Sequence, residues 1–599
     1  MKLLKVIFDI PIEKSFYYIY RKDINSFTRV LAPLGNQERL GFVIEIQENI
    51  NDEVVYKEIK KVYDIYPLIN EEIFKLSKIV SEKYYASLGQ TIFTIIGELP
   101  LRYEKKTIER KEKKIFSPSG YRKEMYLFNN KKEKVNFYLD LISKTKGSLI
   151  FLFPEIEYVE NYYKEMIKST DKKVLKYYGE MNKKDRIKNY FEILWNENLI
   201  IIGTRLAIFL PVSDLNCIII DQPSNSSHRE KREPKYNAVE VAEIRAVLQN
   251  VPIIQTSNSL SINDYYRSTK KELIFIDKRN FESMPEIFII EKKLGEMDKN
   301  INFLTKFTVS LMEETILKGK KVAIVHNRKG NFKTYKCNKC EHVLRCKICN
   351  SILILSENEK MVCKYCKDYT DMTKKCPHCG SKDIIERITG IEKIFRILKN
   401  TYPDFVIQKL TAEERIFSKD TNIFVGTTVI TKILDKIDFG LVIFPHAESF
   451  LNIPQYNAEE VFFLTISEFL WNLDKNGKIL IQTKNPHFEI FSSLKTKNFY
   501  IFYNKEIKIR QQLGYPPFSE IVSIEIPVKK SLIFEDRVNT LKKIISESGE
   551  ILSSEKIKLK GKEYLKFILK IGERKMKFED IMKIKEKMDF KIEINPEII

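Results

Sequence analysis

Residues 337–349 read CNKCEHVLRCKIC, residues 363–366 read CKYC and residues 376–379 read CPHC, and these segments contain eight of the nine cysteines of the 599-residue chain. The eight form four pairs with two residues between partners, a spacing that lets both thiolates of one tight turn reach the same metal at about 2.3 Å. Two such pairs complete a tetrahedral zinc site. The sequence therefore predicts a small module that binds two structural zinc ions through Cys337, Cys340, Cys346, Cys349, Cys363, Cys366, Cys376 and Cys379.

Two other uses of the cysteines fit the sequence less well. A disulfide framework is disfavoured because the rest of the chain holds a single further cysteine, Cys217, and the N-terminus lacks a signal-peptide pattern. An iron–sulfur cluster also takes four thiolates, but neither the bacterial ferredoxin run nor the plant-type spacing occurs. His342 and His378 lie among the pairs, and we expect them to face solvent because eight thiolates already suffice. Zinc binding of about 10–16 kcal/mol supplies the folding energy of so short a stretch, so the module should be unstructured without metal.

The composition is that of a large globular protein. Hydrophobic residues make up 43% of the chain and aromatic residues 12%, which is enough for packed cores and excludes a disordered protein. At this length we expect about four or five domains. No run of 18 or more apolar residues is present, so we expect a soluble, cytoplasmic protein that does not enter membranes.

The charge points to a polyanionic partner. The formal net charge is +21, and two zinc ions with eight thiolates reduce it by four, to +17. Nucleic acid is favoured over an acidic membrane because no basic amphipathic segment stands out. A composition rich in Lys and Ile also follows from an AT-rich genome, so the charge alone does not establish nucleic-acid binding.

The hydrophobic pattern changes several times along the chain. Alternating hydrophobic residues bounded by turn residues predict a small β domain at the N-terminus. Short, nearly continuous apolar runs such as Leu149–Phe153 and Leu199–Ile202 predict parallel strands covered on both faces. The last 80 or so residues follow the order βαββαβ of ferredoxin-like domains. The predicted fold class is thus multidomain α/β, with an N-terminal β domain (1–101), a linker (102–124), a first parallel-sheet lobe (125–290), a second lobe (291–335 and 387–505) that the cysteine module (336–386) interrupts, and a C-terminal ferredoxin-like domain (506–599).

Motifs distributed over most of the chain carry a family resemblance. Residues 514–518 read GYPPF, and partial matches are PEI at 154–156, GTR at 203–205, NRKG at 327–330, GIE at 390–392, GT at 426–427 and QTKNP at 482–486. In this order, and together with the four cysteine pairs, they resemble the PriA family of bacterial replication restart proteins, which are superfamily 2 DNA helicases. The resemblance implies two RecA-like lobes with the zinc module in the second, forked or single-stranded DNA as ligand, and single-stranded DNA-binding protein and other primosome proteins as partners. It also implies nested zinc sites, with Cys337 and Cys340 beside Cys376 and Cys379, and Cys346 and Cys349 beside Cys363 and Cys366.

The ATPase motifs of that family are degenerate in this chain. Residues 129–135 read NNKKEKV where the resemblance places the phosphate-binding loop, so the glycines and the Mg²⁺-binding hydroxyl are missing and only Lys134 remains. Asp221 is followed by Gln-Pro-Ser instead of the family's Glu-Glu-His, and Trp471 and Asp474 stand where the resemblance places arginines. Lys134 and Asp221 are therefore interpreted as remnants of a nucleotide site. We predict that the protein neither hydrolyses ATP nor unwinds DNA, so no catalytic residue is assigned and ATP with Mg²⁺ is not an expected cofactor.

Two further departures concern DNA. The family's N-terminal domain binds a 3′ end with an Asp between two aromatic residues, and the matching residues here are Phe16, Tyr17 and Tyr18, without a carboxylate. Phe16 and Tyr17 are the candidate DNA contacts of this domain, with core packing of Tyr17 as the alternative. The linker is too short for the family's winged helix. Arg205 is the leading candidate for a contact to the DNA backbone, and closing its own loop is its alternative role.

Three hypotheses follow from the sequence. The first is a monomeric DNA-binding protein of replication restart whose helicase lobes serve as a scaffold. The second is an active ATP-dependent 3′–5′ DNA helicase with an atypical nucleotide site, and the third is a zinc-containing interaction protein that does not bind DNA. The missing phosphate loop disfavours the second and the charge disfavours the third, while lost motifs are also what a decaying gene would show.

Overall fold

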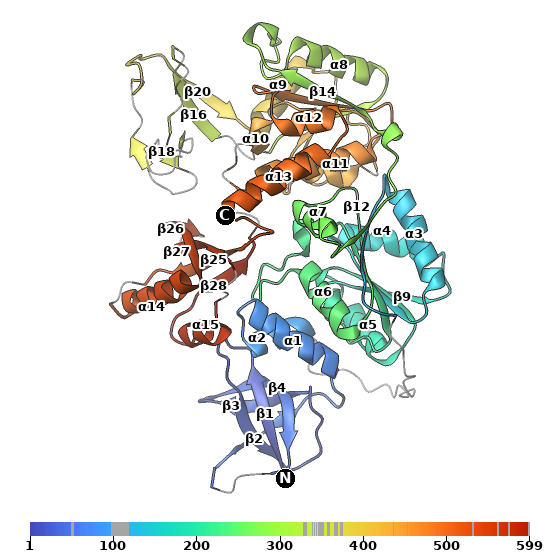
Figure 1. The fold of residues 1–599 in the computed structure, drawn as a ribbon, viewed down its shortest axis with the longest axis vertical. Helices are drawn as coiled ribbons and strands as arrows, with labels where there is room; N and C mark the ends of the chain where they lie inside the picture. Colours follow the sequence, from blue (N-terminus) through green and yellow to red (C-terminus); the bar gives the residue numbers. More distant parts are fainter. Residues whose placement is uncertain are drawn as a thin grey trace.

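The computed structural model describes residues 1–49, 53–97, 119–327, 332–337, 339–340, 342, 344–345, 353–355, 360–363, 369–371, 375–434, 436–451, 453, 455–529, 532–559, 562–572 and 576–596. Figure 1 shows the N-terminal domain at one end of an elongated molecule and the second lobe at the other, with the first lobe and the C-terminal domain between them. In the described ranges, no helix is long and apolar enough to cross a membrane. The multidomain α/β class and the order of its parts are confirmed.

The N-terminal domain is a β-sheet followed by two helices. The sheet has the order β5-β2-β1-β4-β3-β6, and alternate residues such as Leu4, Val6 and Val43 are fully buried in its core. The short strands β5 and β6 pair with β2 and β3 on opposite edges of the sheet. The elements are β1 (Lys2–Phe8), β2 (Phe16–Tyr20), β3 (Arg29–Leu34), β4 (Gln37–Gln47), β5 (Lys57–Glu58), β6 (Lys61–Val62), α1 (Glu71–Lys83) and α2 (Leu88–Ile96).

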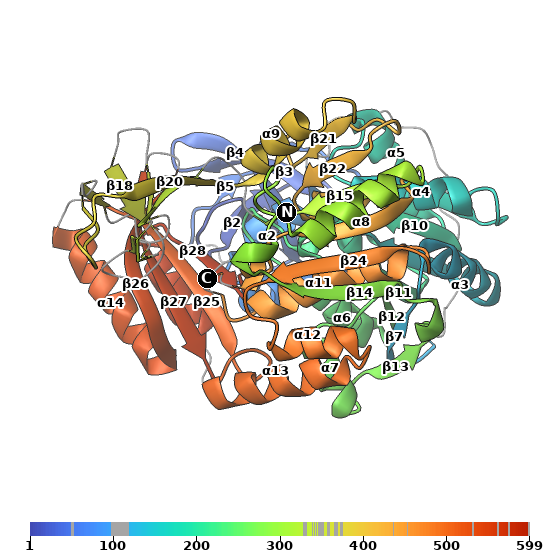
Figure 2. The same ribbon diagram turned by 90° about the horizontal axis from the view of Figure 1, so that it is seen from above.

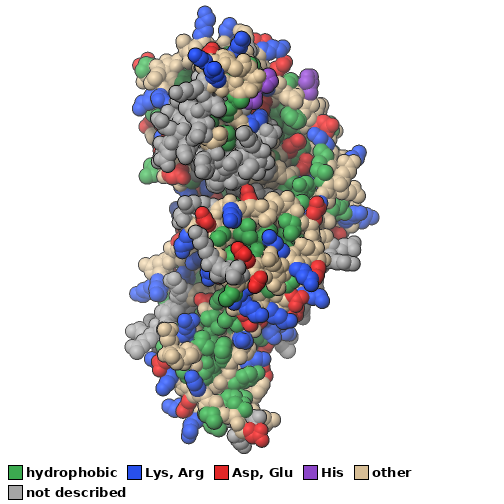
Figure 3. Space-filling model, turned by 90° about the vertical axis from the view of Figure 1, so that its left-hand side faces the viewer, with side chains coloured by type: hydrophobic (Ala, Val, Ile, Leu, Met, Phe, Trp, Pro, Cys, Tyr) green, Lys and Arg blue, Asp and Glu red, His purple; other side chains and the backbone are tan. Residues whose placement is uncertain are grey.

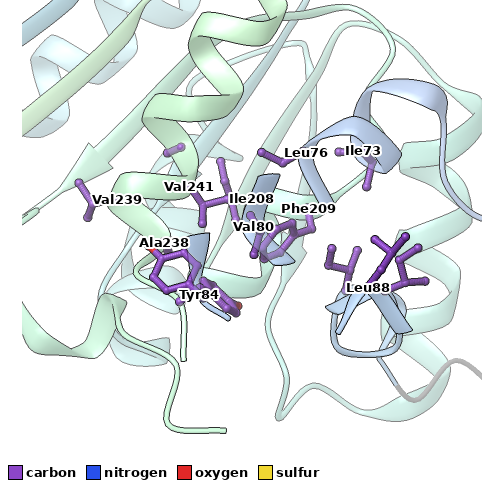
Figure 4. Close-up of a cluster of buried hydrophobic side chains, with 14 of the residues drawn as sticks. Ile73, Leu76, Val80, Tyr84, Leu88, Ile208, Phe209, Ala238, Val239 and Val241 are labelled. Carbon is purple, nitrogen blue, oxygen red and sulfur yellow. The ribbon is translucent and has the colours of Figure 1, made fainter. Parts of the chain in front are cut away.

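Helix α1 joins this domain to the first lobe. Its N-terminus is capped by the side chain of Asn70, and α2 begins with a capping box. Figure 4 shows Leu76 and Val80 of α1 beside Ile208 and Phe209 of the first lobe, and all four side chains belong to one buried hydrophobic cluster. The orientation of the N-terminal domain is therefore fixed by apolar packing on the first lobe.

The first lobe is a doubly wound α/β domain. Its strands are all parallel and have the order β13-β7-β12-β11-β8-β10-β9, and its central strands are buried on both faces, which accounts for their continuous apolar runs. The linker expected over 102–124 lies mostly outside the described residues, and its last two residues begin β7. The elements are β7 (Lys123–Leu127), α3 (Lys131–Lys144), β8 (Ser148–Leu152), α4 (Ile156–Met166), β9 (Lys173–Tyr177), α5 (Lys183–Trp195), β10 (Leu199–Gly203), η1 (Arg205–Phe209), β11 (Leu215–Asp221), η2 (Ser226–His228), α6 (Ala238–Gln249), β12 (Ile253–Ser257), α7 (Ile262–Thr269) and β13 (Ile274–Asp277).

The second lobe is another parallel sheet, of order β14-β24-β23-β15-β22-β21. Strand β14 pairs with β24, so the first lobe ends before Glu286 rather than at residue 290. Helix α13 continues across the expected boundary at 505 and ends at Gly514, which has the left-handed conformation (φ +61°) of a helix C-cap. The elements are η3 (Phe281–Ser283), β14 (Glu286–Glu291), η4 (Leu294–Glu296), α8 (Lys306–Leu317), β15 (Lys321–Val325), α9 (Ile391–Thr401), β21 (Ile407–Leu410), β22 (Ile423–Gly426), η5 (Thr428–Ile433), β23 (Phe439–Phe444), α10 (Glu448–Leu451), α11 (Ala458–Asn472), β24 (Lys478–Thr483), α12 (Glu489–Lys495) and α13 (Tyr500–Leu513).

Two antiparallel sheets complete the molecule. The cysteine module has the order β19-β18-β17-β16-β20, and the C-terminal domain has the order β26-β27-β25-β28. In the latter, the first strand lies between the third and the fourth, as in the ferredoxin-like fold. The elements are β16 (Phe332–Cys337), β17 (Leu353–Leu355), β18 (Lys360–Cys363), β19 (Tyr369–Asp371), β20 (Ile384–Thr389), β25 (Glu520–Pro527), α14 (Leu532–Ser548), β26 (Gly549–Leu559), β27 (Lys562–Ile571), α15 (Phe578–Lys585) and β28 (Lys591–Ile594).

The two lobes share a hydrophobic core. Leu127 and Leu260 of the first lobe belong to the same buried cluster as Phe463 and Tyr503 of the second. Figure 2 shows α7 and α13, which come from different lobes, lying side by side, in agreement with their contacts. Apolar packing therefore continues across the boundary between the lobes.

Candidate functional site

Four thiols of the cysteine module lie together in the part of the chain that the structure describes. The Sγ atom of Cys337 lies 3.5 Å from that of Cys379, the Sγ atom of Cys340 lies 3.6 Å from that of Cys376, and all four lie within 4.8 Å of one another. Tetrahedral zinc with Zn–S distances of about 2.3 Å separates its ligands by about 3.8 Å. The cluster has the dimensions of a metal site, and its four members are those of the outer site in the nested arrangement.

The thiols of Cys337 and Cys340 differ in acidity. The N–H of Cys340 is directed at the Cys337 thiol and lowers the pKa of that thiol to about 6. The N–H of His342 lowers the pKa of Cys340, but burial and the neighbouring thiols outweigh it and raise that pKa to about 12. The N–H of Gly380 donates to the carbonyl of Cys376 at 2.9 Å in a turn that requires a positive φ of +70° at the glycine. Metal binding needs deprotonated cysteines, which the low pKa of Cys337 favours, while the Gly380 turn fixes the backbone beside Cys376 and Cys379.

The other cysteine-module predictions concern residues beside this cluster. The rings of His342 and His378 stack on each other with centroids 5.5 Å apart, and neither is a member of the four-thiol group. Cys346, Cys349 and Cys366 lie outside the described residues, as does the side chain of Cys363.

The expected nucleotide site begins where β7 leads into α3. This connection is only three residues long, 128–130, whereas a phosphate-binding loop needs four residues between its two glycines. The Asn130 side chain caps α3 by accepting from the N–H of Glu133 at 3.1 Å. The Glu133 carboxylate in turn accepts from the N–H of Asn129 at 3.1 Å and from the amide of Asn130 at 3.2 Å. A carboxylate therefore occupies the helix N-terminus at which such folds bind phosphate.

Lys134 and Asp221 form a buried ion pair. The Nζ atom of Lys134 donates to Oδ1 of Asp221 at 2.8 Å, and the two side chains are 5% and 0% exposed. The same oxygen accepts from the Tyr138 hydroxyl at 3.2 Å and from the Thr256 hydroxyl at 3.0 Å. Buried charges persist where they are paired and hydrogen-bonded, so Lys134 and Asp221 stabilise each other through Oδ1, while Oδ2 of Asp221 is buried without a partner among the described residues.

The second lobe adds a carboxyl group to this site. Burial raises the pKa of Glu468, on α11, to about 7, with the Lys134 ammonium opposing the shift and the Asp221 carboxylate adding to it. Trp471, which stands at an arginine position of the family motif, is buried and lies under the guanidinium of Arg279 at 4.6 Å from its ring centroid. The groups that meet here are one lysine and two carboxyls, a set that does not attract a triphosphate.

The candidate DNA residues of the N-terminal domain lie on β2. Tyr17 is 43% exposed, whereas the neighbouring Tyr18 is buried and donates its hydroxyl to the carbonyl of Pro33 at 2.8 Å. Phe16 is half-buried and packs edge-on against Phe8 with ring centroids 5.5 Å apart. Tyr17 is thus a surface aromatic and not a core residue, which leaves its ring free to stack on a base.

Arg205 lies in η1, directly after β10. Its Nε donates to the Glu230 carboxylate at 2.9 Å, and Glu230 is 9% exposed in this pair. The geometry favours the structural alternative, in which the guanidinium closes its own loop.

Comparison with known proteins shows similarity to PriA proteins. Residues 5–97 match the family model of the PriA 3′-DNA-binding domain. The chain is 27% identical over 453 residues to the replication restart protein PriA of Thermotoga maritima, a match that covers 73% of this chain and 60% of that protein. It is 24% identical over 660 residues to PriA of Rickettsia conorii, covering 100% of this chain and 99% of that protein. The chain is therefore similar to PriA replication restart proteins.

The extent of the match differs among PriA proteins. The chain spans about half the length of PriA from Bacillus subtilis, where the match covers 52% of that protein at 26% identity. Among solved structures, RecG bound to a three-way DNA junction is 10% identical with a TM-score of 0.36, covering 65% of this chain and 43% of that one. Yeast Dbp5 bound to RNA and ADP BeF3 is 9% identical with a TM-score of 0.36, covering 74% of this chain and 97% of that one.

Sequence reasoning missed the residues that join the lobes at this site. Lys432 of η5 donates to the Glu155 carboxylate at 2.7 Å, and Lys436 pairs with Glu157. Both carboxylates lie at the start of α4. The only signal in the sequence was that their charge is opposite to that of Lys432 and Lys436. Tyr138, at position i+4 from Lys134 on α3, could have been found from helical spacing.

Proposed function

We propose that this protein binds single-stranded or forked DNA in replication restart and does so without ATP-driven unwinding. The observation that carries the proposal is the match of residues 5–97 to the PriA 3′-DNA-binding domain, together with the exposed ring of Tyr17 on β2. Figure 3 shows Lys and Arg side chains scattered over one face of the molecule rather than gathered in one patch, which suits contacts to the phosphate backbone and not to a base sequence. Arg205, already paired with Glu230, is a secondary candidate for such a contact.

The geometry of the expected nucleotide site supports the prediction that the protein does not unwind DNA. A triphosphate needs backbone N–H groups and cations, but at the start of α3 the Glu133 carboxylate takes the N–H of Asn129 and the Lys134 ammonium is bound to Asp221. Binding a nucleotide would require both interactions to break, the first in a partly buried site and the second in a buried one. Lys134 and Asp221 therefore act as structural remnants.

The cysteine module is proposed to hold two zinc ions in nested sites. Cys337, Cys340, Cys376 and Cys379 would hold one ion, and the donor set and spacing of these four thiols suit zinc. Cys346, Cys349, Cys363 and Cys366 would hold the other.

The cellular setting follows from the relatives. We propose that the protein is a cytoplasmic monomer that works with single-stranded DNA-binding protein and other primosome proteins. Its positive charge of +21 before metal binding suits assembly on DNA.

DNA binding can be tested by fluorescence anisotropy with labelled single-stranded and forked oligonucleotides. We expect sequence-independent binding that weakens with salt, with a log–log slope of about −0.7 for each phosphate neutralised on single strands. Tyr17→Ala should weaken binding to a 3′-ended strand about ten-fold, the effect of one lost stacking contact. Tyr121→Ala, which truncates a tyrosine of 42% exposure in the first lobe, is the control. A salt slope near zero would instead support a zinc-containing interaction protein.

ATP hydrolysis can be tested by phosphate release from Mg-ATP with and without forked DNA. We expect no DNA-stimulated release. Stimulated release that Lys134→Ala abolishes would identify the protein as an active helicase with an atypical nucleotide site.

A further inference from the structure

A pocket of about 160 Å³ lies between the two lobes. The last strand of the first lobe, β13, contributes Phe275, and the segment that follows it contributes Arg279 and Phe281. The second lobe contributes Lys497 and Tyr500 at the start of α13. An engineered apolar cavity of about 150 Å³ binds benzene. The pocket therefore has room for at least one six-membered ring.

The walls of this pocket are aromatic and open to solvent. Tyr500 is 55% exposed and Phe281 is 38% exposed, although both belong to a large folded interface. The Tyr500 ring lies near that of Tyr265 and the Phe281 ring near that of Phe499, at centroid distances of 6.0 and 6.1 Å. The guanidinium of Arg279 lies over the Phe281 ring at 5.1 Å, which leaves Tyr500 as the main stacking surface. Exposed rings held in a concave site are stacking platforms for flat aromatic ligands.

The charges at the pocket are positive. Arg279 is held by the Asp277 carboxylate at 2.7 and 2.8 Å and forms part of the wall. Lys497 is exposed, and its ammonium lies 3.4 Å from the carbonyl of Met284, so it can turn toward an anion at the mouth. In the part of the chain that the structure describes, the residues lining the pocket include no carboxylate. A flat ring attached to a negative group is the ligand class that fits.

We propose that this pocket takes one base of single-stranded DNA, stacked on Tyr500 with its phosphate at Lys497. The proposal rests on the DNA binding proposed above and adds a second contact point, which lies outside the family match at residues 5–97. The base is held by stacking, which every base can make, so the pocket does not discriminate between bases.

The test uses the full-length zinc-loaded protein and oligonucleotides that carry 5-iododeoxyuridine. Irradiation should cross-link the uracil ring to a peptide that contains Tyr500 or Phe281, identified by mass spectrometry. Tyr500→Ala should weaken binding of both oligo(dT) and oligo(dA) about ten-fold. The control Phe307→Ala removes a ring of 50% exposure from α8 and should change neither. Lys497→Gln should reduce the salt slope by about 0.7, the loss of one phosphate contact.

The outcomes separate this proposal from the proposed function. Unchanged oligo(dT) binding by Tyr500→Ala, with cross-links only outside the pocket, would overturn the base pocket and leave DNA binding intact. If the wild-type protein binds no single-stranded DNA, both proposals fail. If the pocket instead takes an aromatic side chain of a protein partner, a protein cross-link should form that Tyr500→Ala loses.

Discussion

At the scale of single residues, Lys134 has kept its identity while its interactions have changed. Its ammonium is bound to Asp221 in a site where the side chains are at most 5% exposed. Removing one partner of a buried ion pair leaves an uncompensated charge, which costs about 3–5 kcal/mol. We therefore expect Lys134→Ala to lower the free energy of unfolding of the first lobe by that amount, measured by urea denaturation. Lys132→Ala, on the exposed side of the same helix, should change it by less than about 0.5 kcal/mol. Equal stabilities of the two variants would contradict the buried pair.

The residue scale is also where sequence reasoning was least complete. Lys134 and Asp221 could be selected because a family motif marks each position. Thr256 could not be predicted as a member of this site, because it is 35 residues from Asp221 in the sequence. It contacts Asp221 because β11 and β12 are neighbours in the sheet. The exposure of Tyr17 likewise could not be predicted, because an alternating strand pattern does not show which face of the sheet is covered.

At the scale of elements, helix α11 carries a pH-dependent group. Burial raises the pKa of Glu468 to about 7 from its ordinary value of 4.5. Between these two pH values the folded protein holds a proton that the unfolded chain releases, so stability falls as pH rises through this window and levels off above about 7. The loss should be about 1–3 kcal/mol. Glu468→Gln should not show it, so its stability relative to wild type should increase between pH 5 and pH 8 in urea unfolding. Parallel pH profiles of the two proteins would refute the assignment.

The two cysteine pairs adjoining β16 and β20 form the second element-scale feature. In a nested arrangement, Cys337 and Cys379 serve one zinc ion, so replacing both with Ser should remove one ion per chain. Replacing Cys337 and Cys349 should remove both ions, because each belongs to a different site. If consecutive cysteine pairs share an ion instead, the first variant should lose both ions and the second should lose one. Metal analysis after gel filtration distinguishes the two arrangements.

Elements were predictable wherever local spacing determines them. The cysteine pairs and the βαββαβ order of the C-terminal domain both follow from residue spacing within short segments. The ends of the first and second lobes were misplaced for a physical reason. The apolar pattern of 286–291 shows a buried strand without stating which sheet it joins, and α13 runs on until Gly514 supplies a left-handed cap.

At the scale of the whole molecule, the lobes are joined by a shared core and not by a linker alone. Leu127 and Leu260 of the first lobe are buried with Phe463 and Tyr503 of the second. The Tyr503 hydroxyl donates to the carbonyl of Leu260 at 3.1 Å, and the Glu460 carboxylate accepts from the N–H of Ile262 at 2.8 Å. A helicase motor needs its lobes to separate and close with each nucleotide cycle. Here separation would expose a continuous apolar surface.

We therefore expect the two lobes to behave as one rigid body. Small-angle X-ray scattering of the wild-type protein should give the same radius of gyration with and without Mg-ATP, because we expect no nucleotide to bind and the shared core to resist opening. Phe463→Ala should destabilise both lobes in a single transition by about 3–5 kcal/mol, since a large side chain is lost from a core to which both contribute. Phe151→Ala, which truncates a buried ring in the core of the first lobe alone, is the control for overall destabilisation. Compaction on adding Mg-ATP would show that the interface between the lobes opens, and so would separate unfolding of the lobes in the wild type. Either result would support an active helicase motor.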